Sequence, residues 1–147
     1  MPYQELDTER MELLAVIHPD LHGPGEYYTE WINMATRHKL FAILLVGDIG
    51  QGGTVDLAAY EAQDDAGTGI QLLDAITTLT QAGGDGDDAV AMTLRTERMD
   101  SQNRYTHVRF RLVFTTASAN ASLVVLGNVP RYAAVGQTAW TETVDVV

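Results

Sequence analysis

The chain has 147 residues, of which 46% are hydrophobic, 20% are charged and none is cysteine. This composition suits one folded domain with a buried core, and it excludes a disulfide framework and a cysteine-ligated zinc site. Twenty acidic residues against nine basic ones give a net charge of −11. We therefore expect no nucleic-acid partner, because binding to the phosphate backbone requires a basic surface.

No membrane partner is expected either. The longest apolar run, residues 40–46, is far shorter than the ~20 residues that a helix needs to cross a bilayer. The acidic N-terminus also lacks the basic and apolar regions of a signal peptide.

The first 25 residues differ in pattern from the rest. A polar start leads into the apolar run 13–17, and then into Pro19 and a turn cluster at residues 22–25. We predict an N-terminal arm over residues 1–25 that can be deleted without unfolding the domain, and its apolar anchors are Leu13, Leu14, Val16 and Ile17. The alternative is a short helix with Leu6, Leu13 and Ile17 on one face.

From residue 26 the pattern is that of successive strands. We predict strands at residues 27–34, 39–46, 54–61, 70–74, 76–80, 90–95, 108–114 and 122–126. The strand at 108–114 alternates apolar and polar residues, which indicates one buried face. The predicted strand at 39–46 is apolar from residue 40 onward, which is typical of a strand buried on both faces.

Seven or eight short strands separated by Gly- and Asp-rich turns predict an all-β fold, an antiparallel β-sandwich of jelly-roll or immunoglobulin-like type. The sandwich is assigned to residues 26–133, with the arm at 1–25 and a C-terminal tail at 134–147. Residues 47–53 lack the lysine of a phosphate-binding loop, so we expect a hairpin with positive φ there.

No catalytic, cofactor or metal residue is predicted. None of the three serines lies in a Gly-x-Ser-x-Gly motif. His18 and His22 are spaced as metal ligands on a helix would be, but Pro19 makes solvated turn residues the better interpretation. The loop 83–88 resembles a calcium loop but fails the EF-hand spacing, so a hairpin turn is expected and a weak cation site is the alternative.

Two groups of residues are candidates for an interface. Tyr27, Tyr28 and Trp31 are either interaction hot spots or core residues. Arg109 and Arg111, with Arg95 and Glu97 on a neighbouring strand, form either a subunit contact or a solvated charged face. Trp140, alone in the tail, is a further candidate.

Short motifs in a fixed order link residues 31–133 to a known family. They are Ile32-Asn33-Met34, Gly53-Thr54-Val55-Asp56-Leu57, the segment 61–69, the segment 75–81, Met99-Asp100, the segment 105–109, Leu126-Gly127 and Arg131-Tyr132. In this order they resemble a family of small tailed-bacteriophage virion proteins that decorate, or cement, the capsid.

The resemblance implies a compact β fold that binds the major capsid protein on the outside of the shell, commonly as a homotrimer. It also implies a location in the virion after assembly in the host cytoplasm. A neck or tail component of the virion is the first alternative. A calcium- or carbohydrate-binding β-sandwich is the second.

Overall fold

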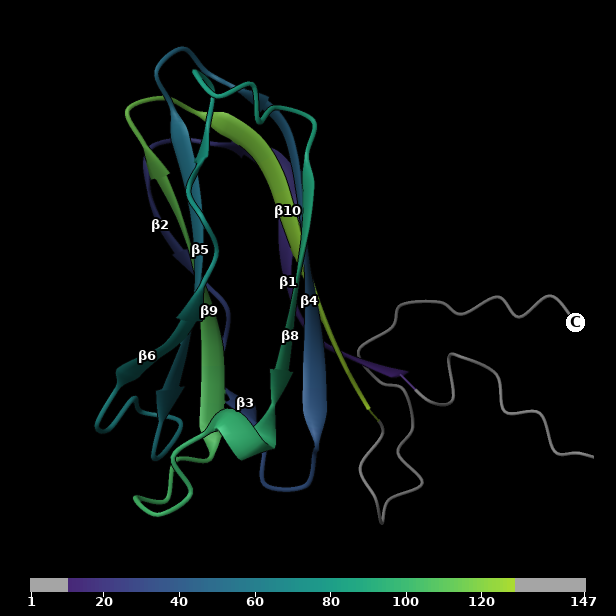
Figure 1. Ribbon diagram of the computed structural model, residues 1–147, viewed down its shortest axis with the longest axis vertical. Helices are drawn as coiled ribbons and strands as arrows, with labels where there is room; N and C mark the ends of the chain where they lie inside the picture. Colours follow the sequence, from purple (N-terminus) through teal and green to yellow (C-terminus); the bar gives the residue numbers. More distant parts are fainter. Residues whose placement is uncertain (1–10, 129–147) are drawn as a thin grey trace, which may run out of the picture.

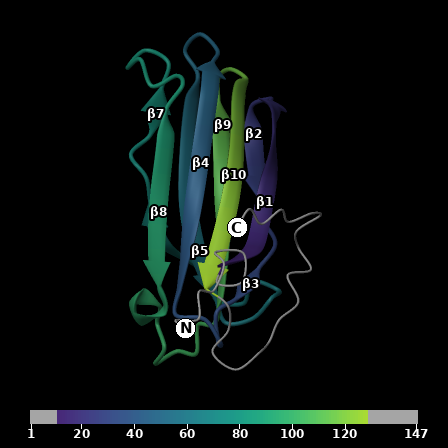
Figure 2. The ribbon, with the colours of Figure 1, turned by 90° about the vertical axis from the view of Figure 1, so that its right-hand side faces the viewer.

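The computed structural model describes residues 11–128, which form two antiparallel β-sheets packed face to face (Figures 1 and 2). Sheet A has the strand order β1-β10-β4-β8. Sheet B has the order β2-β9-β5-β6, with β3 also paired to β9 and β7 to β5. The strands are β1 (Met11–His22), β2 (Gly25–Tyr28), β3 (Ile32–Asn33), β4 (Lys39–Ile49), β5 (Thr54–Ala62), β6 (Gln71–Ala75), β7 (Leu79–Thr80), β8 (Ala89–Arg95), β9 (His107–Thr115) and β10 (Ala119–Asn128).

The predicted all-β antiparallel sandwich is confirmed. The described residues contain ten strands rather than seven or eight. One extra strand arises because the predicted strand at 27–34 divides into β2 and β3, and the other is β1. A short 3-10 turn, η1 (Thr96–Arg98), follows β8.

The strand order is that of a jelly roll. Among the eight longer strands, the first pairs with the last, the second with the seventh, the third with the sixth and the fourth with the fifth. The same pairs form when a chain first folds into one long hairpin. When that hairpin wraps around the core, its successive strand pairs fall alternately into the two sheets. An immunoglobulin-like domain would instead group its strands as ABED and CFG. The order therefore decides between the two sandwich types that the sequence left open.

The core lies between the sheets and follows from the period of two in the strands. In β9 the buried residues are Val108, Phe110, Leu112 and Phe114, and the residues between them point outward. In sheet A, Leu40, Leu44 and Leu123 are almost fully buried against them. The alternation predicted for residues 108–114 is confirmed.

Residues 11–22 correct the predicted arm, because they form β1, the edge strand of sheet A. Nine residues of β1 are paired with β10, and Ile17 is buried in the core. The pairing has irregularities at Leu14 and at residues 18–19. Pro19 lies in the second of these, where a missing N–H costs no ladder hydrogen bond. The two irregularities break the alternation that would have marked a strand, and the helix alternative is wrong over these residues.

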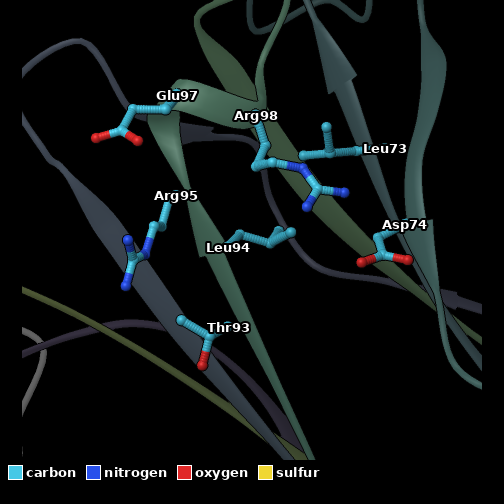
Figure 3. A pocket seen from close by; sticks show the side chains of 7 residues that line it. All are labelled: Leu73, Asp74, Thr93, Leu94, Arg95, Glu97 and Arg98. Carbon is cyan, nitrogen blue, oxygen red and sulfur yellow. The ribbon is translucent and has the colours of Figure 1, made fainter.

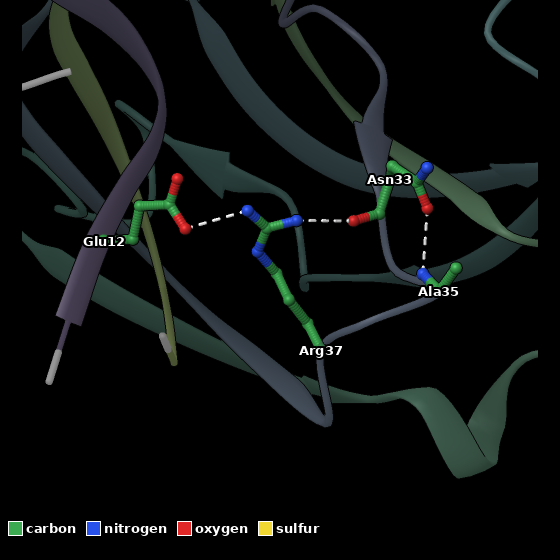
Figure 4. A network of polar contacts seen from close by, with 4 residues as sticks. All are labelled: Glu12, Asn33, Ala35 and Arg37. Atoms are coloured by element: carbon green, nitrogen blue, oxygen red, sulfur yellow. Dashed lines mark hydrogen bonds and ion pairs between the residues drawn. The ribbon is translucent and has the colours of Figure 1, made fainter. Parts of the chain in front are cut away.

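A polar contact fixes β1 to the turn before β4 (Figure 4). Arg37 Nη2 donates to Glu12 Oε2 at 2.8 Å, and Arg37 Nη1 donates to the carbonyl of Asn33 at 2.7 Å. The Asn33 side chain in turn accepts from the Ala35 N–H at 2.9 Å. The Arg37 and Glu12 side chains are only 14% and 18% exposed, so solvent screens this ion pair weakly.

Substitution of Glu12 by Gln is expected to lower the free energy of unfolding by about 1–2 kcal/mol, because it leaves a largely buried guanidinium without its carboxylate. Chemical denaturation monitored by circular dichroism measures this. Glu26→Gln is the matched control: its carboxylate is 52% exposed and 3.6 Å from Arg111, so less than about 0.5 kcal/mol is expected. Equal effects of the two substitutions would contradict the prediction.

Two loops predicted as hairpins instead cross between the sheets. Residues 50–53 carry the chain from β4 in sheet A to β5 in sheet B, and residues 81–88 carry it from β7 in sheet B to β8 in sheet A. The positive φ expected in the first loop is present, at 73° for Gly52. The positive φ is therefore confirmed and both hairpins are wrong, because turn residues do not specify which sheet the next strand joins.

Candidate functional site

The outer face of sheet B carries a cluster of aromatic and arginine side chains, which we call the aromatic–arginine surface. It consists of Glu26 and Tyr28 on β2, Trp31 just after β2, Tyr60 on β5, and Arg109 and Arg111 on β9. Tyr28 on β2 is paired with Arg111 on β9, and Tyr60 on β5 is paired with Arg109 on β9. The two tyrosines therefore lie on either side of β9. These side chains point outward because their neighbours in β9, such as Phe110, occupy the core.

Each arginine of this surface is stacked on aromatic rings. The guanidinium carbon of Arg109 lies 4.4 Å from the centre of the Tyr28 ring and 4.6 Å from that of Trp31. The guanidinium carbon of Arg111 lies 4.9 Å from the Tyr60 ring. Stacking of this kind orders long side chains at a surface and contributes about 0.5–1 kcal/mol per exposed contact.

Glu26 completes the surface at the β2 edge. Its carboxylate accepts a hydrogen bond from Tyr28 Oη at 2.7 Å and lies 3.6 Å from Arg111. The hydrogen bond to this carboxylate raises the pKa of Tyr28 above the ordinary value of a phenol. The same hydrogen bond orients the Tyr28 ring, which lies beside Arg109.

The loop beside Trp31 is held by its own hydrogen bonds. The Asp64 carboxylate accepts from the N–H groups of Ala66 and Thr68 at 3.0 Å, and from the Thr68 hydroxyl. These bonds, the one from the hydroxyl first, lower the pKa of Asp64. Gly67 has φ +82° and would place a Cβ 3.3 Å from the Trp31 ring, so glycine suits both the turn and the close approach.

This arrangement is suited to binding another protein. Stacking occupies the faces of a guanidinium, whereas its N–H donors lie in the plane and remain directed at groups beside it. Arg109 Nε and Arg111 Nε are themselves buried and have no hydrogen-bond partner among the described residues, so a partner reaches only the exposed remainder of each half-buried arginine. Carboxylates and carbonyls are the groups that guanidinium N–H donors bind, and Trp, Tyr and Arg are the residue types enriched at interaction hot spots.

The structure brings together four of the predicted interface residues, namely Tyr28, Trp31, Arg109 and Arg111. Tyr27 is not among them: its ring packs 5.5 Å from Phe114, and its hydroxyl donates to the carbonyl of Gly23. Tyr60 was not predicted as an interface residue, although alternation within residues 54–61 places it on the outward side with Asp56.

Other predicted site residues lie elsewhere. Arg95 is on β8 in sheet A and Glu97 is in η1, so the charged face predicted from Arg95, Glu97, Arg109 and Arg111 is wrong. The sequence neighbours β8 and β9 belong to opposite sheets. Among the predicted arm anchors, Ile17 is buried, Leu14 packs against the core, and Leu13 and Val16 are half-buried. Trp140 lies outside the described residues.

A separate hollow opens at the edge of the sandwich where β6 and β8 face each other. Figure 3 shows Arg98 directed toward Leu73 and Asp74, with Leu94 and Arg95 on the other side. Among the described residues that line it, two arginines and two carboxylates balance in charge, and none is serine or histidine.

The motifs considered for metal binding take structural roles in the described residues. His22 stacks on Phe114 with ring centres 5.2 Å apart, so it is a half-buried strand residue rather than a solvated turn residue. Asp85 Oδ2 accepts from the N–H of Thr80 at 2.9 Å. Residues 11–128 contain no group of three or more His, Asp or Glu side chains that could hold a metal ion. They also contain no helix of the length and hydropathy needed to cross a membrane.

No protein-family model matches the chain, and no curated protein matches it. Solved structures of infectious bursal disease virus do match. The match to a chain of the Gt strain has 15% identity and a TM-score of 0.49, and it covers 85% of this chain and 33% of that one. The match to the Gx strain has 14% identity and a TM-score of 0.41, with the same coverage. The present chain thus spans about a third of the length of these virus chains.

Proposed function

We propose that the protein is a structural component of a virus particle, and specifically a decoration protein that binds the outside of a tailed-bacteriophage capsid. The aromatic–arginine surface is the observation that carries this proposal, and it is the face that contacts the major capsid protein. The partner presents carboxylates or backbone carbonyls to Arg109 and Arg111, together with apolar groups that pack on Trp31.

Two further features support the proposal. The ordered motifs over residues 31–133 resemble the decoration-protein family. Jelly rolls also occur in viral capsid proteins, although lectins and cupins share them, so the fold by itself does not assign a function. A decoration protein acts by contact alone, and weak contacts repeated over a symmetric shell hold it firmly.

Trp31→Ala is expected to weaken attachment to capsids about 10- to 100-fold, because it removes a ring on which Arg109 stacks. The domain should stay folded, since the Trp31 ring lies on the outer face and only half-buried. Binding of the purified variant to capsids stripped of the protein, measured by co-sedimentation, gives the affinity. This result would assign Trp31 to an interface, whereas loss of folding would assign it to the core.

Two variants control this experiment. Leu21→Ala removes a side chain that is 61% exposed and lies on β1, away from the surface, so attachment should not change. Arg109→Lys keeps the charge but loses the planar guanidinium, so an intermediate loss is expected. If Trp31→Ala and Arg109→Lys both bind like the unmodified protein, another face contacts the capsid.

Copy number in purified particles tests the proposed role directly. Quantitative mass spectrometry against the major capsid protein should give hundreds of copies, in a fixed ratio to the shell protein. About a dozen copies or fewer would indicate a neck or tail component, because such parts are closed rings of few subunits. Absence from particles would overturn the virion role and favour a binding module.

A further inference from the structure

The outer face of sheet A is apolar across all four strands, and we call it the apolar face. The register aligns its outward residues in rows. The central row is Val16, Val124, Ile43 and Ala91. One flanking row is Leu13, Leu126, Phe41 and Thr93, and the other is Ser122, Leu45 and Ala89.

Within residues 11–128, no further layer covers this face, as Figure 1 shows. Phe41 and Ile43 are half-buried, and Leu45 is 50% exposed. The apolar residues 40–46 predicted a strand at 39–46 buried on both faces, but the described residues bury only its inner side. An apolar sheet face of this extent is typical of an interaction surface.

Charges of opposite sign border the apolar face at its two ends. Lys39 and Arg95 are paired across β4 and β8 at one end. At the other end, Asp48 on β4 and Asp87 and Asp88 just before β8 are exposed, and Asp20 is exposed on β1. The two ends are about 30 Å apart along β4, at about 3.3 Å per residue.

We propose that the apolar face packs against the same face of a second copy of this chain, with a two-fold axis running along the central row. This axis reverses the strand direction between copies. Ile43 then faces Ile43 of the second copy, and Phe41 faces the second copy's Leu45. The basic end of each copy lies over the acidic end of the other.

Charge complementarity selects a second copy as the occupant. With a net charge of −11, two copies repel each other through most of their surfaces. The apolar rows carry no charge, and reversal of the strands makes the charged ends attract: Arg95 faces Asp87, and Lys39 faces Gly47 and so lies next to Asp48. Two sheets packed in this way interdigitate at a spacing of about 10 Å.

This pairing goes beyond the proposed function, because it uses a different face and does not require a capsid. It also differs from the trimer that the family resemblance implies. Two copies that pack through the same face are related by a two-fold axis and close at two copies, whereas a three-fold axis needs two different patches.

Sedimentation velocity of the full chain at about 50 µM tests the pairing. The expected mass is twice 16.0 kDa. Ile43→Asp should raise the dissociation constant at least about 100-fold, since the axis places two carboxylates together in an apolar contact. Thermal unfolding of the same variant checks that the domain remains folded.

A charge exchange and a cross-link make the test specific to this geometry. Lys39→Asp should weaken the pair about 10-fold, and the double variant with Asp48→Lys should restore it. Because the chain has no cysteine, Ile43→Cys should form covalent pairs with a short bis-maleimide, whereas the exposed Thr115→Cys on sheet B should not.

A mass of one chain for the unmodified protein would overturn the proposal and indicate that other segments of the same chain, or a different protein, cover the face. A mass of three chains would overturn the two-fold axis. Retained pairing in Ile43→Asp would place the contact elsewhere. None of these outcomes depends on capsid attachment, so they leave the proposed function to its own test.

Discussion

Removal of residues 1–25 is expected to abolish the cooperative unfolding transition of this protein. The truncation deletes β1, exposes the whole edge of β10 and removes Ile17 from the core. It also leaves Arg37 without Glu12. The total stability of a domain this size is about 5–15 kcal/mol, and the loss of an edge strand with nine paired residues takes most of it. Thermal unfolding followed by circular dichroism measures the effect.

The matched variant lacks residues 1–10 only. It retains every described strand, and it should unfold cooperatively with a Tm within a few degrees of the full chain. Comparison of the two truncations therefore separates the effect of losing β1 from the effect of losing residues 1–10. If the chain without residues 1–25 unfolds like the full chain, these residues are a dispensable arm and β1 does not stabilise the domain.

Phe110→Ala is expected to lower the free energy of unfolding by about 3–5 kcal/mol. Phe110 is 0% exposed and lies near the middle of β9, the strand that pairs with β2, β3 and β5. Loss of the ring leaves a cavity between the sheets. The backbone beside this cavity is held in place, because the Phe110 N–H donates to Thr29 Oγ1 and the Phe110 carbonyl accepts from the Thr29 N–H.

Denaturant titration measures this loss, and Leu72→Ala is its control. Leu72 is 58% exposed on β6, so truncation of its side chain should change the free energy of unfolding by less than about 0.5 kcal/mol. A small effect of Phe110→Ala would show that the two sheets can close over the missing ring, which contradicts a tightly packed core.

The fold class could be predicted because it depends on local pattern. Alternation in residues 108–114 identifies the buried face of β9, and the Gly- and Asp-rich turns separate the strands. The strand at residues 11–22 could not be predicted, because two irregularities hide its alternation and its partner, β10, is about 100 residues away in the chain. Only the pairing of residues 11–22 with β10 identifies them as a strand.

The candidate site was predictable in part for the same reason. Arg109 and Arg111 are outward by alternation within one strand, and Tyr28 and Trp31 are marked as candidates by residue type. Which residues they meet depends on neighbours in the sheet. Arg95 was placed with them because β8 precedes β9 in sequence, but the crossing between sheets separates the two strands by the thickness of the core.

Residue type and period are enough to specify the all-β class, the acidic charge, most strand positions and the outward direction of the arginines. The jelly-roll order, the place of β1, the stacking of Arg109 on Tyr28 and Trp31, and the alignment of the apolar rows in sheet A become visible in the folded chain alone. These features depend on which distant strands pair and in what register. That choice is made by the whole core at once, so no local pattern specifies it.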